Sequence, residues 1–196
     1  MVNYPNKKKN NHYTSMIEGK HNTAHRGMNL EEDINLTNEY YLSHDIAVIH
    51  KKPTPIQIVK VSYPERSSAK IVEAYFRTPS TTDYNGIYKG KYIDFEAKET
   101  KNETSFPLFM IHPHQIKHLK KVVFHGGIGF FIIRFNYHNE TYLVDSKMLI
   151  DKIENIDKSS IPYTWFQHHG TLIQEGLYPR LAYLKVVDEL YFKEDK

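Results

Sequence analysis

The sequence predicts an α/β domain in which helices pack on both faces of a mixed β-sheet. Three observations in the 196 residues predict this class. Apolar side chains recur at helical spacing in two separate segments, apolar and polar side chains alternate over 93–98, and 128–135 is a continuous apolar run of the kind found in buried central strands. Hydrophobic residues make up 40% of the chain and aromatic residues 13%, enough for a core, which excludes wholesale disorder.

The first expected helix begins near residue 28. Leu30, Ile34 and Tyr41 recur at helical spacing, and Asn29 stands where an N-cap belongs. The acidic residues 31–33 then fall in the first turn, where they complement the helix dipole. This segment is therefore predicted to be an amphipathic helix.

Short strands are expected next, over 47–49 and 56–61. Pro53, Pro55 and Pro64 lie close to the second of these β-branched runs, which favours exposed extended strands at an edge or on a projection. A weak helical pattern, with Ser67 at its capping position, predicts a helix over 67–76. Basic residues gather in the same region, at Lys51, Lys52, Lys60, Arg66 and Lys70. A basic projection is a plausible nucleic-acid probe, and a dimerisation arm is the alternative.

The middle of the chain is predicted to contain hairpins and then a helix and a central strand. The dipeptides Asn85-Gly86 and Lys89-Gly90 are typical of hairpin turns. A helix is expected over 114–123, ended by Gly126-Gly127, and the buried strand follows over 128–135. A strand over 141–144 and a helix over 146–153 are the last elements that the sequence pattern predicts.

Charge and cysteine content exclude several classes of protein. The 26 Lys and Arg against 23 Asp and Glu give a net charge of +3, too small for a polycationic nucleic-acid packer and the wrong sign for an acidic chaperone. Residues 1–26 hold five basic residues and one acidic residue, which predicts a flexible basic N-terminal arm. The absence of cysteine excludes a disulfide scaffold and a thiol nucleophile, and it fits a cytoplasmic protein.

The candidate chemistry lies on the alternating segment. Glu96 and Lys98 are two residues apart, so a strand projects both to one side, while Ile93, Phe95 and Ala97 point to a core on the other. Asp83 precedes the expected hairpin and can converge on Glu96. Two carboxylates suit Mg²⁺, and the adjacent ammonium can stabilise charge that develops on a phosphoryl group. An ordinary ion pair on an exposed strand is the alternative interpretation.

Longer motifs carry a resemblance. The Asp83…Glu96-Ala97-Lys98 arrangement resembles the PD-(D/E)xK nuclease superfamily, and four stretches are similar to the RecU family of Holliday junction resolvases: residues 25–35, 50–61, 79–86 and 92–101. The resemblance implies a restriction-endonuclease-like core with a mixed β-sheet flanked by helices, plus a protruding stalk. It implies a nuclease domain over 27–196, with 51–77 as the stalk insertion, and a homodimer.

The same resemblance implies the roles of individual residues. It places metal ligands at Thr81, Asp83, Glu96 and Gln115, with Lys98 stabilising the transition state. The implied metal is Mg²⁺, for which Mn²⁺ can substitute. Glu31 is a further acid that could complete the metal site, although pairing with the helix dipole explains it equally well. The DNA contacts are expected at Arg66, Lys51, Lys52 and Lys60.

The function expected from these residues is that of a Mg²⁺-dependent, structure-selective endodeoxyribonuclease. It resolves Holliday junctions by paired symmetric nicks in recombination and DNA repair, with four-way junction DNA, a second copy of the chain and the RecA recombinase as partners. One alternative is a protein that binds and remodels junctions or RecA, with cleavage secondary. Another is a nuclease of linear duplexes. His114 and His118 share a helix face, for which phosphate contact or solvation is a better interpretation than zinc.

Overall fold

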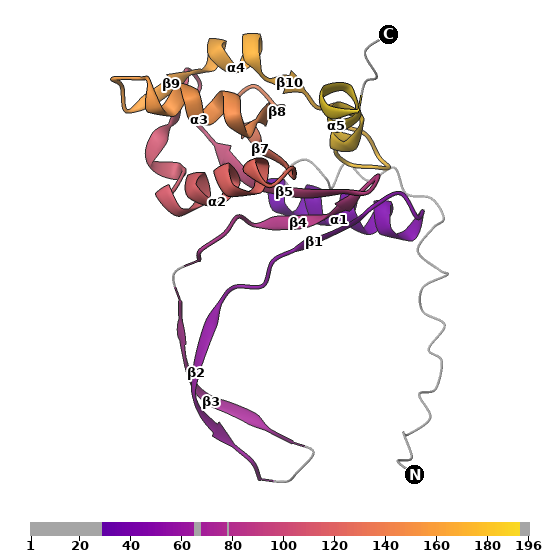
Figure 1. Ribbon diagram of the computed structural model, residues 1–196, viewed down its shortest axis with the longest axis vertical. Coiled ribbons are helices and arrows are strands. Elements are labelled where there is room, and N and C mark those ends of the chain that lie inside the picture. Colours follow the sequence, from indigo (N-terminus) through magenta and orange to yellow (C-terminus); the bar gives the residue numbers. More distant parts are fainter. Residues whose placement is uncertain (1–28, 65–67, 78, 193–196) are drawn as a thin grey trace.

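The computed structural model describes residues 29–64, 68–77 and 79–192. A six-stranded mixed sheet forms its centre, in the order β1-β4-β5-β7-β8-β10 (Figure 1). Only β5 and β7 pair in parallel, and the other neighbours are antiparallel. The strands span β1 (Val48–Lys51), β4 (Tyr84–Tyr88), β5 (Lys91–Thr100), β7 (Ile128–Phe135), β8 (Glu140–Asp145) and β10 (Thr171–Leu172).

Helices cover both faces of this sheet, so the predicted α/β class is confirmed. One face packs against α1 (Leu30–Ser43) and α5 (Tyr183–Tyr191). The other face packs against α2 (Pro113–Phe124), α3 (Ser146–Glu154) and α4 (Tyr163–His169). The pair β6 (Ser105–Pro107) and β9 (Ser160–Pro162) and the short 3-10 helix η2 (Leu108–Met110) lie outside the central sheet.

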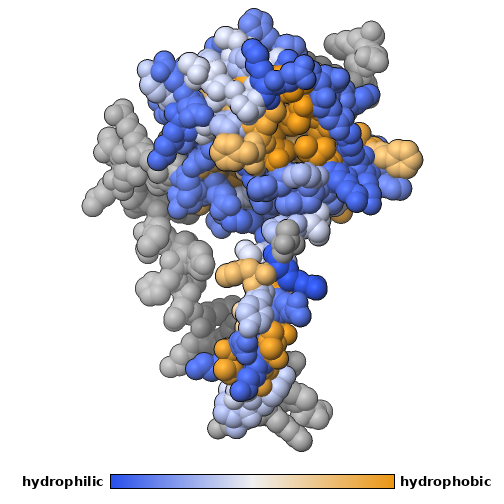
Figure 2. Space-filling model, turned by 90° about the vertical axis from the view of Figure 1, so that its left-hand side faces the viewer, coloured by the Kyte–Doolittle hydropathy of each residue, from blue (hydrophilic) through white to orange (hydrophobic). Residues whose placement is uncertain are grey.

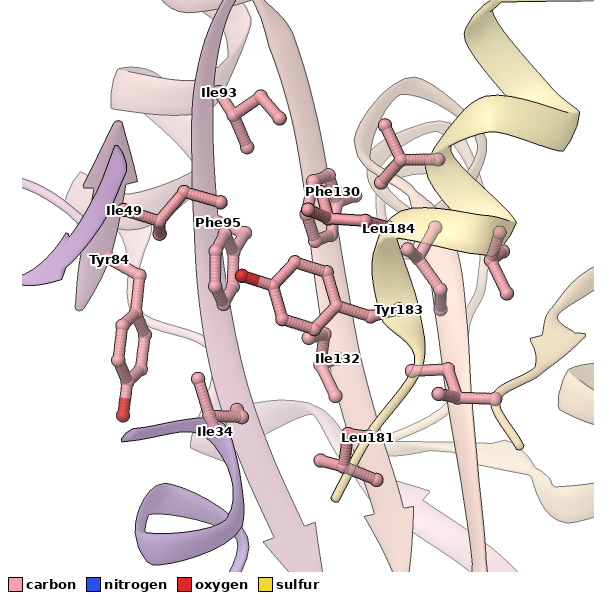
Figure 3. Packing of buried hydrophobic residues seen from close by; sticks show 14 of the residues in the cluster. Ile34, Ile49, Tyr84, Ile93, Phe95, Phe130, Ile132, Leu181, Tyr183 and Leu184 are labelled. Atoms are coloured by element: carbon pink, nitrogen blue, oxygen red, sulfur yellow. The ribbon is translucent and has the colours of Figure 1, made fainter. Parts of the chain in front are cut away.

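Strands β7 and β8 each supply two hydrophobic cores because their side chains alternate between the faces. In β7, Phe130 and Ile132 enter the core beneath α1 and α5, while Phe131 and Ile133 enter the core beneath α2 and α3. Figure 3 shows Phe130 beside Phe95 of β5, with Tyr183 of α5 packed over both strands. The Phe95 and Phe130 rings stack 4.7 Å apart. Burial of each such ring stabilises the fold by about 2 kcal/mol.

The predicted first helix is confirmed with its cap. The Asn29 side chain accepts a hydrogen bond from the Glu32 N–H (2.8 Å), and the Glu32 carboxylate accepts one from the Asn29 N–H (3.3 Å). This reciprocal pair satisfies backbone donors that a helix start leaves free. The helix expected over 114–123 is present as α2, and it connects the parallel strands β5 and β7.

The helix expected over 67–76 is wrong. Strand β3 (Lys70–Phe76) occupies the described part of that range and pairs antiparallel with β2 (Ile56–Ser62). All seven residues of β3 are exposed, so a helix there would have no apolar face to bury. Pairing with β2 instead satisfies the backbone hydrogen bonds of a segment rich in β-branched and aromatic residues.

The expected turn at Asn85-Gly86 is also wrong, because both residues lie inside β4 and pair with β5. The turn that joins these strands is Lys89-Gly90, where the two residues have φ of 47° and 74°. A two-residue turn of this kind requires left-handed backbone at both positions. Gly86 serves a different purpose, since a Cβ there would collide with the backbone oxygen of Val48 in β1.

The hairpin of β2 and β3, here called the stalk, projects from the domain, as predicted (Figure 1). Its strands pair only with one another, and they carry hydrophobic and hydrophilic side chains that both face outward (Figure 2). The expected basic arm over 1–26 and the expected DNA contact Arg66 lie outside the described residues. No helix within the described ranges is long and apolar enough to cross a membrane.

Candidate active site

Strand β5 presents its polar side chains to the face that α2 covers. Because Ile93 and Phe95 enter the core beneath α1, the intervening side chains point the other way. Glu96 is fully buried there, and Lys98 is largely buried. The Nζ atom of Lys98 lies 2.6 Å from Oε1 of Glu96. The sequence expectation that these two side chains share one side of a strand is therefore met by the structure.

Asp83 lies beside Glu96, as the sequence expectation required. It directly precedes β4, and its backbone oxygen accepts a hydrogen bond from the N–H of Lys52 (2.7 Å), the residue after β1. The pKa of Glu96 is raised to about 8, first by burial and then by hydrogen bonding to Asp83 and by its charge. The Lys98 ammonium opposes this rise. Two carboxylates and one ammonium thus converge in a buried place.

Both carboxylate oxygens of Glu96 are buried, and the polar groups beside them are the Asp83 carboxyl group and the Lys98 ammonium. A single cationic side chain, at 2.6 Å from Oε1, therefore faces two acids. A buried carboxylate in this condition is costly, and a hard cation relieves it because carboxylate oxygen is the ligand that Mg²⁺ prefers. The described ranges contain no group of three or more His, Asp or Glu arranged to hold a metal. The residues therefore fit a two-carboxylate site completed by neutral oxygens and water.

The two neutral ligands expected from the sequence lie in segments that flank the pair. Thr81 is half-buried, two residues before Asp83, and its hydroxyl donates to the Thr82 carbonyl (3.3 Å). Gln115 is buried in the first turn of α2, which packs against β5. Its Oε1 accepts a hydrogen bond from the His112 N–H (2.8 Å), which caps the helix and leaves one lone pair of the oxygen.

Glu31 lies in the first turn of α1 and is exposed. Its carboxylate pairs with Lys51 (2.6 Å). Its backbone oxygen accepts a hydrogen bond from the Tyr84 hydroxyl (3.5 Å), whose pKa is raised by burial first and then by the charges of Glu31, Asp83 and Glu96. Glu31 thus contacts the residue that follows Asp83, and its part in the metal site stays a prediction.

The lysines expected to contact DNA have different surroundings. Lys60 lies on the exposed strand β2 of the stalk, and Lys51 is engaged with Glu31 at the surface. Lys52 is largely buried, and its Nζ lies 2.8 Å from Oδ2 of the buried Asp94. Its charge is thus used inside the protein, although its role toward DNA stays a prediction.

His114 lies next to Gln115 in α2, and from the sequence it was expected to contact phosphate or to be solvated. Its Nε2 is buried and has no hydrogen-bond partner among the described residues. Its pKa is lowered by burial first and then by His112 and Lys98, while Asp83 acts in the opposite direction. The sequence does contain one signal for His114 as a site residue, which is its position next to Gln115. Helical spacing alone does not show that this position faces the site.

Several known proteins are similar to this chain over most of its length. The family model described as "RecU: Recombination protein U" matches residues 25–189. A protein of Bacillus cytotoxicus named Holliday junction resolvase RecU is 53% identical over 197 residues, which cover 97% of this chain and 98% of the relative. A protein of the same name from Bacillus anthracis is 53% identical over 199 residues, with the same coverage.

Among solved structures, the Holliday junction resolvase Hjc of Archaeoglobus fulgidus matches 72% of this chain and 92% of its own chain. Its TM-score is 0.42 and its sequence identity 12%.

Proposed function

This chain belongs to the RecU family, and on that premise we propose how its residues cut DNA. The chain is a Holliday junction resolvase, an endodeoxyribonuclease of recombination. We propose that Asp83 and Glu96 hold the divalent metal that this activity requires, that Thr81 and Gln115 add neutral oxygen ligands, and that Lys98 stabilises the transition state.

One observation carries the proposal. Glu96 is fully buried and lies against a second carboxyl group, with a single ammonium beside them. An arrangement kept only for stability would pair each buried acid with donors, as buried polar groups are paired in general. Two carboxylates held together with one ammonium are suited to share a cation.

The residues have separate tasks in hydrolysis of a phosphodiester. Asp83 and Glu96 supply negative charge from opposite sides of the site, one from the segment before β4 and one from β5. Lys98 is held near the reacting phosphate by its ion pair, so its ammonium can stabilise the negative charge that grows on the phosphoryl oxygens. The bound cation lowers the pKa of water and polarises a phosphoryl oxygen. We propose Mg²⁺ as this cation, with Mn²⁺ as a substitute.

Junction resolution requires two symmetric cuts, so we propose that the protein acts as a homodimer. An isologous pair places one site against each of two strands of like polarity. The stalk projects from the domain and is exposed along nearly all of both strands, which suits contact with the four arms of the junction or with RecA. Because the substrate is chromosomal DNA, we propose that the protein works in the cytoplasm.

The test is to measure binding and cleavage of a synthetic four-way junction and a linear duplex for Asp83→Asn, Glu96→Gln and the wild type, with and without Mg²⁺. We expect both variants to bind the junction within about twofold of the wild type and to lose cleavage by at least ~100-fold, because each loses a ligand charge. Glu154→Gln is the matched control, since it removes an exposed carboxylate that pairs only with Lys120 on the far side of α2.

Three outcomes contradict parts of the proposal. Cleavage that survives in either variant means that the site residues are wrong. A wild type that binds junctions but never cuts them favours the remodelling function. Equal cleavage of the linear duplex means that the enzyme is not selective for structure.

A further inference from the structure

Asp94 is a second buried carboxylate on the site face of β5, two residues before Glu96. Unlike Glu96, it is surrounded by donors. Four side chains from four segments donate to it: the Thr82 hydroxyl to Oδ1, and Lys52 Nζ (2.8 Å), Tyr92 OH (2.8 Å) and His118 Nε2 (2.9 Å) to Oδ2. The function proposed above does not use this carboxylate.

The contact with Thr82 restrains the first metal-ligand segment. Thr82 is buried and lies between Thr81 and Asp83. A hydrogen bond from its hydroxyl to Oδ1 of Asp94 therefore holds the backbone on both sides of it. A hydrogen bond to a carboxylate is stronger than one between neutral groups.

The contact with His118 restrains the second segment. His118 lies in α2, three residues after Gln115, so the two side chains stand on neighbouring positions of one helix face. The hydrogen bond between His118 Nε2 and the Asp94 carboxylate therefore joins α2 to β5, the strand that carries Glu96.

The contact with Lys52 brings the base of the stalk into the same network. Lys52 follows β1 and begins the connection to β2. Its Nζ donates to Asp94 and to Thr82 Oγ1 (2.9 Å), and its backbone N–H donates to the Asp83 oxygen (2.7 Å). One residue thus contacts the buried acid, the threonine and the metal-ligand segment.

We propose that Asp94 is a positioning residue that holds the Thr81–Asp83 segment and α2 against β5, and that Lys52 and Thr82 act through it to set the geometry of the metal site. This inference rests on the proposed function. Every segment that carries an expected metal ligand is joined to Asp94 through a hydrogen bond or through its own strand. Outer partners of this type control metal affinity because they orient the ligands.

The test measures Mn²⁺ affinity of the DNA-free protein by calorimetry, so that it does not depend on cleavage. We expect Thr82→Val and Asp94→Asn each to raise the Mn²⁺ Kd by roughly 10- to 100-fold, and Thr82→Ser to restore wild-type affinity, because it keeps the hydroxyl. Lys52→Met is expected to raise the Mn²⁺ Kd as well. The double variant Thr82→Val/Asp94→Asn should bind Mn²⁺ no more weakly than the weaker of the two single variants. Each single substitution already removes the hydrogen bond between Thr82 and Asp94.

Asp33→Asn is the matched control. Asp33 is also a buried acid with two cationic partners, Arg134 (2.7 Å) and Arg180 (3.0 Å), but it lies in α1 on the opposite face of the sheet. Its substitution should lower the free energy of unfolding and leave the Mn²⁺ Kd unchanged.

The positioning role is overturned if folded Thr82→Val and Asp94→Asn bind Mn²⁺ as the wild type does, or if Asp33→Asn weakens binding equally. If Asp94→Asn does not fold, Thr82→Val decides the question, since it leaves the Lys52–Asp94 ion pair in place. A Lys52→Met protein with normal Mn²⁺ affinity but weaker junction binding would assign Lys52 to DNA and remove it from the network. Failure of the proposed function looks different: the wild type itself would then bind no metal, or Asp83→Asn would bind it normally.

Discussion

Asp94 and Glu96 are equally buried on one face of β5, but their surroundings are opposite in kind. Four donors satisfy Asp94, so its charge is stabilised by the protein itself. Glu96 faces the Asp83 carboxyl group and a single ammonium. The protein itself therefore stabilises the charge of the first carboxylate, whereas burial and Asp83 oppose the charged form of the second.

At the residue scale, the raised pKa of Glu96 predicts pH-dependent metal binding. With a pKa of about 8, Glu96 is protonated in most metal-free molecules at pH 6.5. A cation must then displace that proton, so we expect the Mn²⁺ Kd to fall about tenfold per pH unit between pH 6 and 7 and to level off above pH 8. Calorimetry in two buffers of different ionisation enthalpy should detect about one proton released per metal at pH 6.5. A Kd that stays constant from pH 6 to 8 contradicts this assignment.

The same pKa determines how stability changes with pH in the metal-free protein. Between the ordinary value of 4.5 and about 8, the folded protein holds the Glu96 proton more tightly than the unfolded chain does. Stability is therefore lost as the pH rises through this window. Glu96→Gln removes the effect, so its free energy of unfolding relative to the wild type should increase by on the order of 2 kcal/mol from pH 5 to pH 8. Denaturant unfolding in EDTA at both pH values measures this difference.

At the element scale, the site depends on how closely β1 approaches β4. Gly86 allows this approach, because a Cβ at that position would also lie 2.6 Å from the Ile49 Cα. The register of β1 in turn places Lys52 next to the Asp83 backbone. A glycine inside a strand, which was expected to mark a turn, thus marks a close contact between backbones.

We therefore expect Gly86→Ala to destabilise the protein by more than about 2 kcal/mol, because backbone must move to admit the methyl group. Gly90→Ala is the control: its Cβ would meet open space, and only the φ of 74° resists the change, so the expected cost is about 1 kcal/mol. Thermal and denaturant unfolding of both variants gives the comparison. Equal losses would mean that the β1–β4 contact is not close.

Helices and strands were predicted correctly from the sequence where their own side chains determine the structure. α1 has its capping residues and its apolar spacing, and β7 is apolar along its whole length. β3 was missed because its structure comes from a partner strand and not from burial of its own residues. The hydrogen bonds between β2 and β3 depend on both strands. The periodicity of one segment therefore does not predict them.

At the scale of the whole molecule, the net charge of +3 hides an uneven distribution. The site face of β5 holds two buried acids, while Lys60 is exposed on a stalk whose two strands pair with each other. Contacts between such a stalk and DNA phosphates release counterions, so they make junction affinity depend on salt.

We expect log Kd for a four-way junction to rise linearly with log salt concentration, and Lys60→Ala to reduce that slope by about one. Lys120→Ala is the control, because it removes an equal charge from α2 that is already paired with Glu154 (2.6 Å). Titrations by fluorescence anisotropy at several salt concentrations, with Ca²⁺ in place of Mg²⁺, measure both slopes. An unchanged slope in Lys60→Ala would mean that this part of the stalk does not contact DNA phosphates.

The sequence by itself determined the α/β class, the first helix, the central strand and the shared side of Glu96 and Lys98. Each of these depends on spacing along one segment, and spacing is written in the chain. The tertiary structure decided that Asp94 has four donors while Glu96 faces a second acid, that Lys52 turns inward, and that Gly86 lies against β1. Most of these contacts join different segments, such as Lys52 and Thr82, which are 30 residues apart. Burial and electrostatics act through space and not along the sequence.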